Sequence, residues 1–282
     1  MTEVYIPVIL LGVLTLIFGA FLVFSAEKFK VKKDERIEKI HEILPGIDCG
    51  ACGAPGCAAF AGGVVEGKYG VNGCKAGGQE AANKIAEIMG VKNKDTGEEK
   101  IAVLLCLGDN ETAKRISNYN GIMTCEALHL TGGNKGCQYG CLGLGDCVRA
   151  CPFNAIEMGE NGLPYVIEEN CTACGVCVKT CPRSLFELIP KDQDIYIACS
   201  SYDDAKIVKN ACSRGCIGCS LCTRVIENET IIMEGKLAKV QWDKIKDNKV
   251  LEPAIEKCPA KTFVRRSELK KGQKKEKIAV KI

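Results

Sequence analysis

Cysteine thiolates at short, regular spacings are the residues of this chain that could do chemistry. Of its 20 cysteines, four stand in Cys171-Thr-Ala-Cys174-Gly-Val-Cys177-Val-Lys-Thr-Cys181-Pro182. This spacing places three thiolates on one 4Fe-4S cluster and lends the last thiolate to a second cluster. The run is highly specific, and it predicts that the chain carries electrons.

An earlier run contains Cys137, Cys141, Cys147 and Cys151-Pro152, with gaps of three, five and three residues. In a two-cluster ferredoxin, the first three cysteines of one run share a cluster with the last cysteine of the other. We therefore assign one cluster to Cys137, Cys141, Cys147 and Cys181, and another to Cys171, Cys174, Cys177 and Cys151. The wider gaps hold Gly140, Gly143 and Gly145, which can accommodate a looser loop.

The C-terminal third holds half of such a pair. Cys216, Cys219 and Cys222 begin a run, and Cys258-Pro259 closes another. The positions that would complete the second cluster are Ile226, Asn248, Leu251 and Ala254. Because all four missing ligands belong to one cluster, we expect the other cluster to remain at Cys216, Cys219, Cys222 and Cys258. The alternative for Cys258 is an ordinary buried thiol.

A complete set of ligands also stands near the N-terminus, at Cys49, Cys52, Cys57 and Cys74. The surrounding glycines allow backbone amides to approach the sulfurs. Four-thiolate zinc sites use comparable spacings. The ferredoxin-like runs that follow favour iron.

Four cysteines are left over: Cys106, Cys125, Cys199 and Cys212. Two come from each half of the chain, at matching places. They predict either a fifth 4Fe-4S cluster at the junction of the halves or four inert buried thiols. Iron and sulfide counts separate these alternatives, with about twenty of each for five clusters and about sixteen for four.

The elements that must position these ligands form an internal repeat. Apolar segments at 100–106 and 194–199 predict buried strands that end at Cys106 and Cys199. Each is followed by acidic residues, an Ala-Lys pair, another cysteine and a Gly-Cys run, so that 101–190 and 194–259 have one plan of strand, helix and iron-sulfur module. Before the repeat, residues 33–43 and 79–89 have helical patterns.

The N-terminal run from Val4 to Phe24 has 21 residues and no charge. It is long enough to cross a hydrocarbon core about 30 Å thick, which predicts a single membrane anchor. The alternative, a cleaved signal peptide, is disfavoured by the length of the run and by the lack of a basic segment before it. Lys28, Lys30, Lys32 and Lys33 follow the run, which predicts that the bulk of the chain is cytoplasmic, at the inner membrane of the cell.

Composition excludes several classes of function. Cysteine-rich chains are often secreted disulfide frameworks, but these spacings suit metal thiolates in a reducing cytosol. A formal charge of +3 indicates no nucleic-acid partner. The sequence has no phosphate-binding glycine motif, and its lone His41 and His129 cannot form a Rieske pair.

The predicted fold class is α+β, with one transmembrane helix followed by small iron-sulfur domains, including a two-cluster ferredoxin-like domain and a partly degenerate second copy. The expected boundaries are an anchor at 1–25, a juxtamembrane helix at 26–45, an N-terminal 4Fe-4S domain at 46–92, a strand-helix segment at 100–136, the two-cluster domain at 137–190, its second copy at 194–259 and a basic tail at 260–282. The tail is expected to be solvated, and contact with anionic lipid heads is the weaker alternative.

The anchor, the segment GIDCGACGAPGCAAFAGGVVEG with Cys74, and the segment GCLGLGDCVRACPFNAI before Cys171 together resemble one family. This family is the B subunit of the Rnf ion-translocating ferredoxin:NAD oxidoreductase complexes of bacteria. The resemblance implies an electron-transfer subunit without a complete active site of its own. It also implies soluble ferredoxin as the donor and flavin-bearing and NAD-binding subunits as partners. The degenerate run at Ile226, Asn248, Leu251 and Ala254 departs from the fuller C-terminal extensions of the family.

Two other classes remain open from the residues alone. One is the iron-sulfur subunit of another membrane enzyme, such as a hydrogenase or a formate-oxidising complex. The other is a zinc-thiolate interaction protein without redox chemistry.

Overall fold

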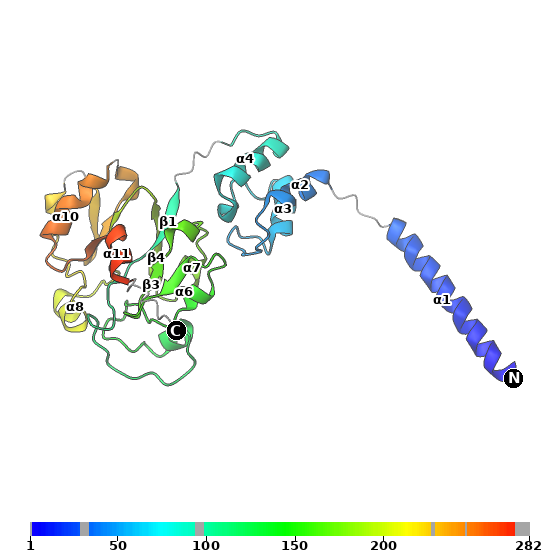
Figure 1. Ribbon diagram of the computed structural model, residues 1–282, viewed down its shortest axis with the longest axis horizontal. Helices are drawn as coiled ribbons and strands as arrows, with labels where there is room; N and C mark the ends of the chain where they lie inside the picture. Colours follow the sequence, from blue (N-terminus) through cyan, green and yellow to red (C-terminus); the bar gives the residue numbers. More distant parts are fainter. Residues whose placement is uncertain (1, 29–33, 94–98, 227–228, 246, 274–282) are drawn as a thin grey trace, which may run out of the picture.

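The computed structural model describes residues 2–28, 34–93, 99–226, 229–245 and 247–273. Three parts follow one another along the chain: a long helix, a small helical unit, and a larger unit that holds all the named strands (Figure 1). Helices and short strands together confirm the α+β class. Lys30, Lys32, Lys33, most of the polar segment at 93–99 and the tail from 274 onward lie outside the described residues.

The first helix, α1 (Thr2–Lys28), contains the uncharged run. The large apolar side chains described on it, from Ile9 to Phe24, are between 47% and 75% exposed. Within the described part of the chain, no helix combines the length and the apolar character needed to span a membrane.

The small unit packs α2 (Glu35–Ile43), α3 (Cys57–Val65) and α4 (Gly78–Met89) together, with the 3-10 turn η1 (Lys75–Gly77) before α4. The Asp34 side chain caps α2 by accepting from the Arg36 amide, and Gly90 ends α4 in the left-handed conformation. Ile40, Phe60 and Ile85 are fully buried at the centre. The helices expected over 33–43 and 79–89 thus occur as α2 and α4.

The larger unit contains the same strand plan twice. In the first copy, β1 (Lys100–Leu104) pairs antiparallel with β4 (Phe186–Pro190), and the hairpin β2 (Ile156–Met158) and β3 (Pro164–Val166) lies between them in sequence. In the second copy, β5 (Ile195–Ile197) pairs with β8 (Phe263–Arg265) around the hairpin β6 (Ile231–Glu234) and β7 (Leu237–Val240). Each copy therefore joins its first and last strands.

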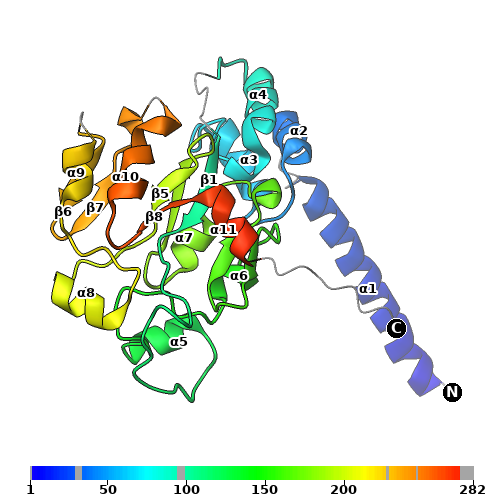
Figure 2. The same ribbon diagram turned by 60° about the vertical axis from the view of Figure 1, so that its left-hand side comes forward.

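Short helices connect these strands (Figure 2). The first copy has α5 (Cys125–Leu130), α6 (Asp146–Arg149), η2 (Glu168–Asn170) and α7 (Val176–Thr180). The second copy has α8 (Ala205–Ala211), α9 (Leu221–Val225), η3 (Trp242–Lys244), η4 (Asn248–Leu251), α10 (Glu252–Lys257) and α11 (Arg266–Gln273).

The structure differs from the expected tail at 260–282. Residues 263–265 form β8, and α11 follows directly to Gln273. The physical reason is that Phe263 and Val264 are apolar and buried, and that β8 supplies the strand with which β5 pairs. The second copy therefore extends past residue 259.

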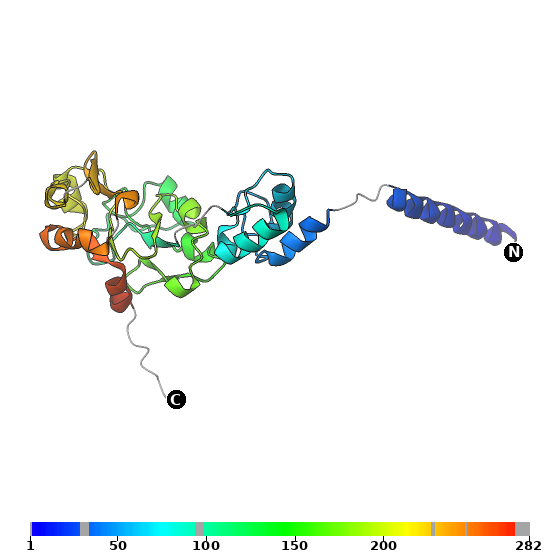
Figure 3. The same cartoon turned by 90° about the horizontal axis from the view of Figure 1, so that it is seen from above.

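The two copies share an apolar core made of Ile101, Val103 and Ile189 from the first copy with Tyr196, Ala198 and Val264 from the second. Trp242 Nε1 also donates to Glu187 Oε1 at 2.8 Å across the junction. On the other side, Lys179 Nζ of α7 donates to the Ala51 carbonyl of the small unit at 3.3 Å. Figure 3 shows the helical unit beside the larger one, with α1 apart from both.

Candidate metal centres

Three cysteine loops of the larger unit share one backbone conformation. The loops are 141–147, 171–177 and 216–222, and each has a left-handed residue at its third and fifth positions. The third residues are Gly143, Ala173 and Gly218, with φ of 74°, 53° and 64°, and the fifth are Gly145, Gly175 and Ser220, with φ of 77°, 78° and 56°. The segment 141–147 is therefore a regular ferredoxin loop, and its fourth position holds Leu144 where the other loops hold Cys174 and Cys219.

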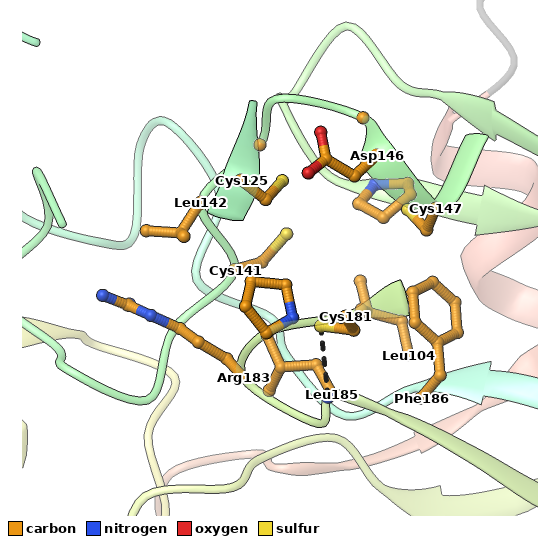
Figure 4. Close-up of a pocket in the computed structure, with 14 residues that line it drawn as sticks. Leu104, Cys125, Cys141, Leu142, Asp146, Cys147, Cys181, Arg183, Leu185 and Phe186 are labelled. Carbon is orange, nitrogen blue, oxygen red and sulfur yellow. Dashed lines mark hydrogen bonds between the residues drawn. The ribbon is translucent and has the colours of Figure 1, made fainter. Parts of the chain in front are cut away.

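Cys125 takes the place of the ligand that Leu144 cannot supply. Cys125, Cys141, Cys147 and Cys181 line one cavity. Figure 4 shows the four cysteines around it, with the Arg183 side chain extending away. Thr124 caps α5 by accepting from the Ala127 amide, and Asp146 Oδ2 accepts from the Glu126 amide at 3.3 Å. These contacts hold Cys125 beside the loop.

Burial raises the pKa of two thiols of this set, Cys141 and Cys147. Burial, together with the neighbouring Cys125 and Cys181, raises the pKa of Cys147 to about 12. Burial is also the main cause that raises the pKa of Cys141, next to Cys106. Ligation must therefore displace protons from this set.

The structure exchanges two ligands relative to the sequence assignment. Spacing in the sequence predicts Cys137 beside Cys141, Cys147 and Cys181, and leaves Cys125 in the left-over set. The structure instead groups Cys125 with those three cysteines and Cys137 with the left-over set. The looser loop predicted for the gap between Cys137 and Cys141 is not needed, because the regular loop begins at Cys141. The loop supplies Cys141 and Cys147; Cys181 comes from the other run, as in the sequence assignment, and Cys125 stands in for the missing thiol at position 144.

Cys137 lies instead with Cys106, Cys199 and Cys212 around a second cavity at the junction of the two copies. Each copy supplies two of these cysteines. In the first copy, Cys106 follows β1 and Cys137 stands four residues before Cys141. In the second copy, Cys199 follows β5 and Cys212 stands four residues before Cys216. Backbone N–H groups two residues further along the chain point at all four sulfurs, from Gly108, Tyr139, Ser201 and Arg214.

In each copy, an equivalent backbone hydrogen bond joins the junction set to the neighbouring cysteine loop. The Cys141 amide donates to Cys106 Sγ at 3.3 Å, and the Cys216 amide donates to Cys199 Sγ at 3.3 Å. The junction set therefore has an approximate two-fold symmetry that matches the internal repeat.

The Cys-Pro turns also repeat. After Cys151, Cys181 and Cys258, the third following residue is left-handed, with φ between 48° and 50° at Asn154, Ser184 and Lys261. The amide of the fourth following residue then donates to the cysteine sulfur at 3.3 to 3.4 Å. Cys258 thus has the turn of the other two residues, although the sequence left an ordinary thiol as its alternative.

Cys216, Cys219, Cys222 and Cys258 line a third cavity, as the sequence grouping had them. The four positions that would complete another cluster are occupied differently. Ile226, Leu251 and Ala254 are at most 5% exposed and form the apolar core of the second copy, while Asn248 begins η4. A hydrophobic core fills the region where the first copy has its corresponding thiols.

Two sets remain. Cys49, Cys52, Cys57 and Cys74 line a cavity in the helical unit, where the Cys57 amide at the start of α3 donates to Asp48 Oδ1 at 2.5 Å. Cys171, Cys174, Cys177 and Cys151 lie together beside α7. Burial raises the pKa of Cys177 to about 12, helped by Cys171 and Cys174.

The chemistry of the sets suits iron-sulfur clusters. Thiols on glycine-rich loops, with backbone N–H groups directed at the sulfurs, are the environment that these clusters use. Among the described residues, no three His, Cys, Asp or Glu side chains are grouped closely enough to hold a single metal ion.

Neighbouring sets lie near one another in one order. Cys49 of the helical unit lies near Cys174, and Cys177 lies near Cys147. The amide contacts then join Cys141 to Cys106 and Cys216 to Cys199. The five sets therefore follow one another in a line rather than around a centre.

Sequence reasoning missed two cations beside these sets. Lys135 is 4% exposed, and its Nζ donates to the Gly108 carbonyl at 2.6 Å. Arg183 lies between two cavities and donates to the carbonyls of Cys137 and Gly140. No periodicity or motif marks either residue, and only their position in the fold does.

Two family models match the chain. Residues 44–76 match a family described as "Putative Fe-S cluster", and residues 136–185 match the "4Fe-4S dicluster domain". Each match covers one of the cysteine-bearing regions described above.

Curated relatives cover most of the chain. It is 40% identical over 260 residues to the B subunit of the Na(+)-translocating ferredoxin:NAD(+) oxidoreductase complex of Acetobacterium woodii, an alignment that spans 92% of the chain and 77% of the relative. It is 39% identical to the B subunit of an ion-translocating oxidoreductase complex of Methanosarcina acetivorans, over 80% of the chain and 86% of the relative. The B subunit of the proton-translocating ferredoxin:NAD(+) oxidoreductase complex of Clostridium ljungdahlii is 35% identical, over 85% of each.

Proposed function

Since the chain belongs to the family of B subunits of ion-translocating ferredoxin:NAD(+) oxidoreductase complexes, we propose that its five cysteine sets form a single line for electrons. The family resemblance expected from the sequence is confirmed, and the chain is an iron-sulfur electron-transfer subunit of such an enzyme complex. We further propose the number of clusters, their ligands, the electron donor and the membrane anchor.

Each set would hold one 4Fe-4S cluster, which when bound gives and takes one electron at a time. The ligand sets are Cys49, Cys52, Cys57 and Cys74; Cys151, Cys171, Cys174 and Cys177; Cys125, Cys141, Cys147 and Cys181; Cys106, Cys137, Cys199 and Cys212; and Cys216, Cys219, Cys222 and Cys258. The chain's own contribution is to bury these ligands, to direct N–H groups at the sulfurs and to fix their order.

The observation that carries this proposal is the pair of matching contacts from Cys141 to Cys106 and from Cys216 to Cys199. They place the junction set between the two-cluster region and the C-terminal set. Without a cluster at the junction, the C-terminal set would be separated from the others. A continuous line therefore requires five clusters and not four.

Electrons would enter at the C-terminal end of the line. Cys219 is the one cysteine that is exposed rather than buried or half-buried, and it belongs to the terminal set. The relatives from Acetobacterium and Clostridium are named for ferredoxin and NAD(+). We therefore expect reduced soluble ferredoxin to meet this end and partner subunits that bear flavin and bind NAD to receive the electrons.

The opposite end of the line would lie at the membrane. The N-terminal set begins at Cys49, only 25 residues after Phe24, the last residue of the uncharged run described above. Within the described part of the chain, no protein surface covers the apolar side chains of α1 from Ile9 to Phe24, which supports burial in lipid. The proposed anchor thus brings the last set of the line close to the bilayer.

Quantitative iron and acid-labile sulfide analysis of the full chain, purified without oxygen, tests the proposal. About twenty of each per chain is expected for five cubanes, and about sixteen would remove the junction cluster. Zinc in place of iron would overturn the electron line as a whole. Anaerobic mixing with reduced ferredoxin then tests the donor, since electron transfer oxidises ferredoxin while reducing this chain, and electron paramagnetic resonance signals of reduced clusters of the chain should appear only if electrons enter it.

A further inference from the structure

Lys135 is a buried positive charge that the fold does not neutralise with a carboxylate. Its side chain is 4% exposed, and its one described hydrogen bond goes to the Gly108 carbonyl. Among the described residues, no carboxylate lies within ion-pair distance of its ammonium group. A buried ammonium is costly unless an opposite charge stands beside it.

Asp109, a carboxylate on which the charge of Lys135 acts, is occupied by other partners. Asp109 accepts hydrogen bonds from the amides of Glu111 and Thr112 and from the Thr112 hydroxyl, at 2.7 to 3.0 Å. Burial raises the pKa of Asp109, but these bonds and the charge of Lys135 together lower it below its ordinary value. Asp109 therefore remains an anion, and its Oδ1 atom accepts hydrogen bonds from Glu111 and Thr112 of its own loop.

The cysteines of the junction set are the other groups around Lys135. Gly108, which receives its hydrogen bond, also lines the junction cavity and donates its own amide to Cys106 Sγ at 3.4 Å. The charge of Lys135 acts on Cys212 of the same set and on Cys141 of the neighbouring set. Four thiolates on a cluster carry net negative charge, which suits the unpaired ammonium.

Other charges near this cavity are mainly positive. Arg214 lines it, and the half-buried guanidinium of Arg183 lies near Cys106 and Cys137. Asp203 lines it and Asp109 acts on Cys212, and both carboxylates oppose these cations. By contrast, all the described residues that line the C-terminal cavity, from Cys216 to Phe263, are neutral apart from their thiols.

We propose that Lys135 raises the reduction potential of the junction site, formed by Cys106, Cys137, Cys199 and Cys212, above that of the C-terminal site, so that an electron entering at the C-terminal end moves on to the junction. The inference rests on the five-cluster line. Reduction adds one negative charge, and a nearby buried cation stabilises the reduced state because the interior screens it weakly. The backbone N–H groups at all four sulfurs act in the same direction.

The test compares three variants with the parent chain, purified without oxygen and titrated potentiometrically under electron paramagnetic resonance. Lys135→Gln removes the charge but keeps a donor for the Gly108 carbonyl, and Lys135→Arg keeps the charge. Lys114→Gln is the matched control, because Lys114 is an exposed lysine whose backbone, and not its side chain, holds the neighbouring segment. A Cys137→Ser variant identifies the signal of the junction site.

Lys135→Gln should make the reduction equilibrium of that one signal at least tenfold less favourable, which is 59 mV for one electron. Lys135→Arg and Lys114→Gln should leave it unchanged. The inference is overturned if Lys135→Gln keeps all its iron and every potential of the parent chain, or if Lys135→Arg shifts the signal equally.

A second variant keeps the inference testable if Lys135→Gln loses iron. Asp203→Asn removes an opposing charge without touching Lys135, and it should shift the same signal to a more positive potential. No shift in that variant contradicts the electrostatic argument. An iron count near sixteen in the parent chain would instead show that the junction site holds no cluster. That result would contradict the proposed function, whereas an unchanged potential in a chain with about twenty irons would contradict only this inference.

Discussion

The backbone N–H of Cys141 donates to the sulfur of Cys106 at 3.3 Å. This single contact joins a ligand of a ferredoxin-like loop to a cysteine that follows a strand 35 residues earlier. The second copy of the repeat makes the same contact between Cys216 and Cys199. Each copy thus presents one end of its own cysteine loop to a common site at the junction.

The exchange of Cys125 and Cys137 gives a rescue experiment. Cys125→Ser should damage the cluster of the first ferredoxin loop, because Leu144 cannot replace the lost thiolate. Adding Leu144→Cys should restore it, since residue 144 occupies the loop position that Cys174 and Cys219 occupy elsewhere. Iron content and the number of cluster signals measure the result.

Leu142→Cys in the same Cys125→Ser background is the matched control, because Leu142 lines the same cavity but stands at the wrong loop position. It should give no rescue. Equal rescue by both substitutions, or an unharmed cluster in the Cys125→Ser variant, would contradict the assignment.

The apolar core that replaces a cluster in the second copy can be tested by truncation. Leu251 is fully buried among the residues of this core. Leu251→Ala should lower the free energy of unfolding by about 2 to 5 kcal/mol, the cost of emptying such a site. Anaerobic urea unfolding followed by circular dichroism measures it. Ile207→Ala, at a position 51% exposed on α8, should change stability by less than about 0.5 kcal/mol.

Solvent access predicts the order in which clusters are lost. Cys219 is exposed, whereas Cys57 of the helical unit and Cys141 and Cys177 of the central sets are buried. Under limited anaerobic chelation followed by alkylation, Cys216, Cys219, Cys222 and Cys258 should become labelled first, as measured by mass spectrometry. Earlier labelling of the central sets would show that exposure does not control iron loss.

Iron should support the fold of the helical unit. Its core is small, and α3 begins at the ligand Cys57 while the turn before α4 begins at Cys74. Small metal domains derive much of their folding free energy from ligation. Chelation should therefore greatly speed amide hydrogen exchange in α3 and α4, and anaerobic reconstitution with iron and sulfide should reverse the change. Protection that survives complete iron loss would show that Ile40, Phe60 and Ile85 suffice.

Local features of this protein followed from the sequence. The grouping of Cys49 to Cys74, the retained set at Cys216 to Cys258, and the helices at α2 and α4 depend on residues close together in the chain or on the repeat. Spacing, turn residues and apolar periodicity encode such features directly. The internal repeat likewise indicated that Cys106 and Cys199 correspond.

Only the tertiary structure decided which distant thiol completes each set. The gap from Cys125 to Cys141 is bridged by a helix and loops whose path depends on packing, such as the contact of α5 with Asp146. Spacing alone favoured Cys137, because it is nearer in the chain. The burial of Lys135 against Gly108 depends in the same way on the fold, since chain separation and distance in space become unrelated once loops return to a common core.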